Sequence, residues 1–72
     1  MPRSLRADFE SVDAAQAAAE TIAHTGVGRD RIHVSAEPAP ALTVVARDSE
    51  LGALREMLRE RGARSTRIEE SG

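Results

Sequence analysis

The sequence predicts one α+β domain whose elements follow the order β-α-β-β-α-β. Two segments repeat apolar residues at helical spacing, three shorter segments alternate apolar and polar residues with the two-residue period of a strand, and a fourth is rich in strand-forming residues. A glycine follows each helical segment, and a proline-containing stretch separates the two middle strands. The 72 residues suffice for a single domain, residues 1–72.

The first strand and the first helix are expected before residue 26. Alternation over residues 3–9 places Leu5, Ala7 and Phe9 on one face of a strand. Ser11 can cap the helix that follows, because its hydroxyl accepts an orphan backbone N–H. Gly26 is expected to end this helix, because glycine adopts the left-handed conformation without penalty. The apolar stripe of the helix consists of Val12, Ala15, Ala18 or Ala19, and Ile22.

The two middle strands are expected to form a hairpin. Residues 31–36 form the first of them, with Ile32 and Val34 facing the core. Residues 37–40 cannot continue a ladder, because their two prolines lack the N–H, and they predict the hairpin loop. Residues 41–47 carry apolar side chains on both faces, which predicts a central strand or one covered by a partner.

The second helix and the last strand complete the pattern. Asp48 or Ser49 is expected to cap the helix, and Gly62 to end it. The apolar stripe of this helix consists of Leu51, Leu54 and Met57 or Leu58. Residues 64–69 are expected to form the fourth strand, and the chain to fray over residues 69–72. The residues of this strand that are expected to face the core are Thr66 and Ile68.

Two β-α-β units joined by a hairpin predict a ferredoxin-like open-faced sandwich. Right-handed crossovers place both helices on one face of a four-stranded antiparallel sheet of order 4-1-3-2. The other face is left open, so an interface is expected there or along a strand edge. The candidate interface residues on the open face are Arg6, His33, Thr43, Val45 and Arg67.

Several kinds of chemistry are not supported by the composition. The absence of cysteine excludes disulfides, thiolate metal sites and a cysteine nucleophile. The two histidines, His24 and His33, are expected on opposite sides of the sheet, which disfavours a metal site. Nothing arranges a nucleophile, a base and an orienting group, so we expect no enzyme and no cofactor.

The partner expected from these features is a second copy of the chain. The core is aliphatic and rich in alanine, so association adds buried apolar area that a small domain lacks. Val45 on the outer face favours such a homodimer, and another protein is a further possible partner. One alternative is a small-ligand sensor of the amino-acid-binding regulatory type, with its site at a dimer interface near residues 26–30.

A second alternative is a nucleic-acid-binding domain that uses Arg6, Arg67 and the other C-terminal arginines. The net charge of −2, with both signs interspersed, does not favour a general polyanion binder. The outward positions of the central strands also carry no aromatic residue on which a base could stack. The other arginines of the C-terminal group are Arg55, Arg59, Arg61 and Arg64.

We expect a cytoplasmic protein without a membrane partner. No apolar run approaches the roughly 20 residues that a membrane span needs, and residues 1–6 lack the apolar core of a signal peptide.

Residues 9–18, Gly26 and residues 30–34 resemble the small bacterial heat-induced or general stress protein domain. The shared features are a Phe, a short acidic or Ser cap, an Ala-rich helix, a Gly stop and a short Ile-x-Val strand, over the first half of the chain. The resemblance implies a stress-linked, non-catalytic bacterial protein, and it transfers no site residues.

Overall fold

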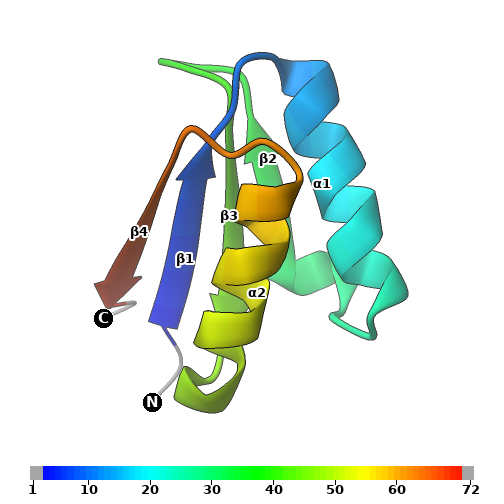
Figure 1. Ribbon diagram of the computed structural model, residues 1–72, viewed down its shortest axis with the longest axis vertical. Coiled ribbons are helices and arrows are strands. Elements are labelled where there is room, and N and C mark those ends of the chain that lie inside the picture. Colours follow the sequence, from blue (N-terminus) through cyan, green and yellow to red (C-terminus); the bar gives the residue numbers. More distant parts are fainter. Residues whose placement is uncertain (1–2, 71–72) are drawn as a thin grey trace.

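The computed structural model describes residues 3–70, and their element order is the predicted one (Figure 1). The elements are β1 (Arg3–Asp8), α1 (Val12–His24), the short 3₁₀ helix η1 (Arg29–Arg31), β2 (Ile32–Ser35), β3 (Ala41–Ala46), α2 (Asp48–Glu60) and β4 (Ser65–Glu70). The strands form one antiparallel sheet of order β2-β3-β1-β4. This order confirms the predicted ferredoxin-like sandwich.

Helix α1 begins and ends where its sequence predicts. The Ser11 Oγ accepts the backbone N–H of Ala14 at 3.1 Å, which satisfies one of the orphan donors of the first turn. Gly26 has a φ of +106°, the left-handed conformation that favours glycine after a helix. The residues that α1 buries are Ala15, Ala18 and Ile22, two of them small, so the helix can approach the sheet closely.

Helix α2 begins earlier than predicted, by one residue relative to Asp48 as the cap and by two relative to Ser49. Its N-cap is Arg47, and Asp48 is already the first helical residue. The Glu50 side chain accepts the backbone N–H of Arg47 at 3.0 Å, which is the carboxylate half of a capping box. Asp48 and Glu50 instead lie inside the first turn, where negative charge is favoured by the helix dipole.

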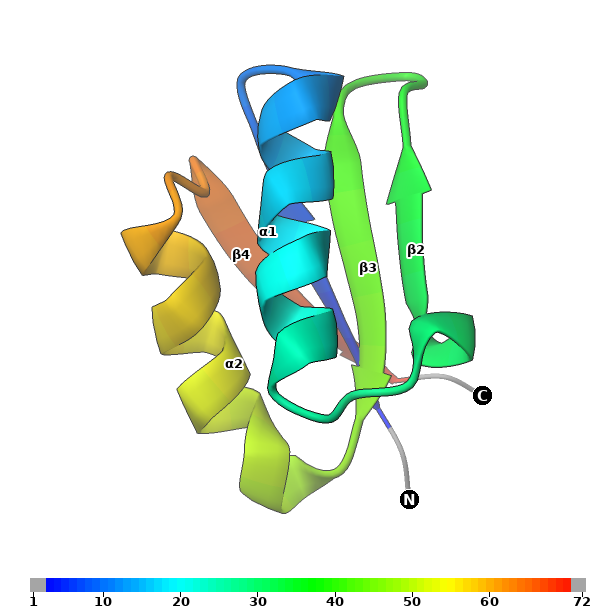
Figure 2. The ribbon, with the colours of Figure 1, turned by 90° about the vertical axis from the view of Figure 1, so that its right-hand side faces the viewer.

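The core lies between the sheet and the two helices, which cover the same face (Figure 2). The fully buried large side chains come from every layer of the sandwich: Leu5, Ile22, Leu42, Leu58 and Val44. Among the described residues no polar or charged side chain is buried. The fold therefore depends on apolar packing, with polar groups left at the surface.

The edge strands differ from the prediction in three places. Arg31 belongs to η1, so β2 begins only at Ile32. Ile68 lies on the helix side of β4, opposite Leu5, yet it is 41% exposed. The reason is its position on an edge strand, because α2 contacts β4 at Thr66 through Arg55, and Ile68 lies two residues further along the strand. Of the residues expected to fray, Glu69 and Glu70 belong to β4, and residues 71–72 lie outside the described part.

Candidate functional site

The open face of the sheet carries the predicted interface residues in an ordered arrangement. Arg67, Arg6, Thr43 and His33 are register partners from β4 to β1, β3 and β2, so they form one row across all four strands. Val45 lies outside this row, two residues along β3 from Thr43. Four of the five predicted residues are thus neighbours on one surface, and the fifth is adjacent to them.

The next row on this face adds an acidic group. Asp8 lies opposite Ser65 in the register of β1 and β4, and the Ser65 hydroxyl donates a hydrogen bond to the Asp8 Oδ2 at 2.9 Å. The Arg6 Nε lies 3.8 Å from the Asp8 Oδ1. The face therefore mixes positive, negative and uncharged polar groups. Such a mixture suits contact with another protein surface more than contact with a uniform polyanion.

A groove on the other side of the molecule follows α1 and the β2 edge. Its volume is about 430 Å³. The residues that line it are Gln16, Ala19, Glu20, Ala23, Arg29, Ile32 and Val34. The small alanines of α1 leave this space between the helix and the two apolar side chains of β2. The groove lies beside residues 26–30, where the sequence places a ligand site in the sensor alternative.

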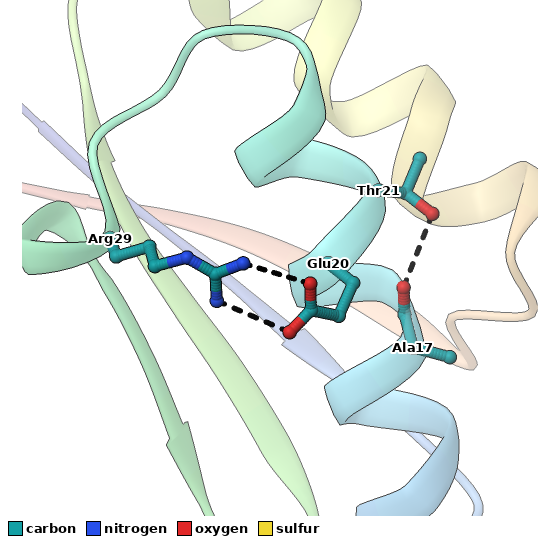
Figure 3. A network of polar contacts seen from close by, with 4 residues as sticks. All are labelled: Ala17, Glu20, Thr21 and Arg29. Atoms are coloured by element: carbon teal, nitrogen blue, oxygen red, sulfur yellow. Dashed lines mark hydrogen bonds and ion pairs between the residues drawn. The ribbon is translucent and has the colours of Figure 1, made fainter.

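An ion pair crosses the rim of the groove (Figure 3). The Arg29 Nη1 donates to the Glu20 Oε1 at 3.1 Å, and Nη2 donates to Oε2 at 2.9 Å. The bidentate hydrogen bond first, and the opposite charge second, lower the pKa of the Glu20 carboxyl and raise the pKa of the Arg29 guanidinium. A ligand carboxylate at this rim would therefore compete with Glu20 for the Arg29 guanidinium.

The sequence did not indicate this pair. Glu20 is a helix-surface residue and Arg29 lies nine positions away, beyond the end of α1. No helical spacing joins them, and only the packing of η1 beside α1 brings them together. The only hint in the sequence was a charged residue, Arg29, in the connection that follows α1.

The arginines of the C-terminal group lie on more than one surface. The Arg55 Nε donates to the Thr66 Oγ1 at 3.1 Å, which ties α2 to β4. The Arg59 Nη1 lies 3.7 Å from the Glu56 Oε1 on the same helix. These two cations face α2 and β4 neighbours, whereas Arg6 and Arg67 lie on the open face. The structure therefore separates the arginines that the nucleic-acid alternative groups together.

The histidines also lie apart. His24 ends α1 on the helix side of the sheet, and His33 is exposed on the open face. Within residues 3–70 no group of three or more acidic or histidine side chains is placed to hold a metal ion. In the same part of the chain, neither helix has the length and apolar character needed to cross a bilayer.

The fold defines the chain as an α+β open-faced sandwich of the ferredoxin-like class. Comparisons of the chain with models of protein families, with curated proteins and with solved structures found no match. The resemblance to the heat-induced stress protein domain therefore stays a prediction.

Replacing Arg29 with Gln is expected to raise the pKa of Glu20 back toward its ordinary value. The Arg29 guanidinium lowers the pKa of Glu20. The ion pair therefore stabilises the fold at pH values above the ordinary pKa of glutamate. This stabilisation is lost as the pH falls through the lowered pKa of Glu20 in the folded chain. An NMR titration of the side-chain carboxyl carbons measures the shift. Arg31→Gln is the matched control, because Arg31 lies in the same 3₁₀ helix without a bond to Glu20. An unchanged Glu20 pKa in Arg29→Gln would contradict the assigned cause.

Proposed function

We propose that the chain is a non-catalytic interaction module that works as a homodimer. The observation that carries this proposal is the incomplete cover of the sheet. Within residues 3–70 both helices pack on one face, and β2 and β4 are each paired on one side only. Uncovered strand edges present unpaired N–H and C=O groups, which readily template pairing with another strand.

The composition of the core supports association. Within residues 3–70, five of the thirteen buried apolar residues are alanine, so the core gains little area per residue. A domain of this size usually needs a further source of stability, and this chain has no cysteine for a disulfide. A second copy can supply the missing buried area across an interface.

The open face supports a protein partner over a nucleic acid. Thr43 and Val45 are half-buried there, and Asp8 balances Arg6 beside them. Phosphate binding relies on an excess of positive charge, whereas the net charge of this chain is −2. On sequence grounds we also propose a bacterial cytoplasmic setting and the stress-linked role that the resemblance implies.

Sedimentation analysis of the purified chain tests the homodimer. We expect the weight-average mass to rise toward twice the mass of the chain between micromolar and millimolar concentration. Interference optics are required, because the chain has no Trp and no Tyr to absorb near 280 nm. A monomer throughout this concentration range would overturn the proposal.

A further inference from the structure

The outer edge of β4 combines an unpaired backbone with an exposed apolar side chain. Among the described residues, Ile68 is the one large hydrophobic side chain that is exposed. It lies on the helix side of the sheet, in register with Leu5, Val44 and Ile32 across the other strands. The apolar row of the core therefore runs out to the β4 edge and ends there without cover.

Two opposite charges flank Ile68 on the other face of the same strand. Arg67 and Glu69 are exposed neighbours of Ile68 that point to the open face. Neither side chain has a hydrogen bond or an ion pair within residues 3–70. The strand therefore carries an unpaired positive charge before Ile68 and an unpaired negative charge after it.

This order of charges is self-complementary under a two-fold axis. When a strand pairs antiparallel with its own copy in one continuous sheet, directly opposed residues point to the same face. If the axis passes at Ile68, Arg67 lies opposite Glu69 of the partner subunit, and Glu69 lies opposite the partner's Arg67. Ile68 then lies opposite the partner's Ile68 on the helix side. Both charges are paired and the apolar row continues across the axis.

The neighbouring registers lack this match. An axis at Arg67 sets two arginines directly opposite each other, and an axis at Glu69 sets two glutamates opposite each other, both of which are unfavourable. The other sheet edge is a poorer candidate. β2 has only four residues, and none of them forms a pair of opposite charges that could meet its own copy across a two-fold axis.

We propose that two copies of the chain join through β4, antiparallel and with Ile68 at the two-fold axis, into one eight-stranded sheet. The proposal rests on the homodimer proposed above and names its interface and register. All four helices then lie on one face of the joined sheet. A single strand pair buries less area than a standard stable interface, so the dimer dissociates at micromolar to millimolar concentration.

Two charge reversals, studied separately and mixed, test the register. In R67E both charges beside Ile68 are acidic, and in E69R both are basic, so each homodimer opposes like charges. We expect each variant alone to dissociate about tenfold or more readily than the unchanged chain. In an equimolar mixture the acidic strand faces the basic one, so a heterodimer of about the original affinity is expected. Native mass spectrometry with one isotope-labelled chain distinguishes the heterodimer from the homodimers.

Asp30→Arg and Arg31→Glu are the matched controls, because they make the same charge changes at η1, beside the opposite edge of the sheet. They are expected to leave dimerisation of the chain unchanged, and circular dichroism confirms that each variant folds. If the unchanged chain dimerises but R67E and E69R do so equally well, the β4 interface is wrong while the homodimer stands. If the mixture forms no heterodimer, the register is wrong. If the unchanged chain is monomeric, both proposals fall.

Discussion

Replacing Phe9 with Ala is expected to lower the free energy of unfolding by about 3–5 kcal/mol. Phe9 is only 3% exposed and is the one aromatic side chain of the chain. Its backbone N–H donates to the Pro40 carbonyl at 3.0 Å, which holds the residue in place at the end of the sandwich. A close-packed core relaxes only partly around a deleted side chain, so a cavity term adds to the lost burial.

This loss is large against the stability of so short a chain. At about 0.05–0.15 kcal/mol per residue, a domain of this length has roughly 4–11 kcal/mol of stability in total. Urea unfolding followed by far-ultraviolet circular dichroism measures the change, because the two helices report folding and no Trp is present. Phe9→Leu keeps most of the apolar volume and is expected to lose clearly less. Equal losses in the two variants would contradict the packing described for Phe9.

Most of the fold could be predicted because local signals agree with one another. Ser11 and Gly26 mark the two ends of α1. The structure confirms Ser11 by its capping hydrogen bond and Gly26 by its positive φ. The start of α2 was missed because Arg47 is not a residue type that caps helices. Glu50, three residues later, accepts the backbone N–H of Arg47, and this half of a capping box was present in the sequence.

The faces of the candidate site could be predicted, whereas its details could not. The two-residue period of a strand determines which face a side chain occupies, so Arg6, Thr43 and Arg67 were placed correctly. The exposure of Ile68 depends on where α2 lies across the sheet, and the pairing of Glu20 depends on where η1 packs. Both are set by tertiary packing, which leaves no mark at a fixed spacing in the sequence.

The position of Ile68 at the two-fold axis allows a direct geometric test. In the proposed register the two Cα atoms of residue 68 are about 4.5–5.5 Å apart, within the range that a disulfide can span. The chain has no cysteine, so Ile68→Cys introduces a single thiol. Thr66→Cys is the matched control on the same face of β4. In this register residue 66 lies opposite residue 70 of the partner subunit. The two Cα atoms of residue 66 are therefore separated by four residues along the strand, about 13 Å, which is too far for a disulfide.

Oxidation of the two single-cysteine variants under mild, identical conditions therefore tests the β4 pairing most directly, with mass spectrometry of the non-reduced products as the measurement. Pairing through β4 with residue 68 at the axis predicts that Ile68→Cys becomes a disulfide-linked dimer while Thr66→Cys stays largely unlinked. A Thr66→Cys chain that links as fast as Ile68→Cys, or an Ile68→Cys chain that does not link at all, would contradict it.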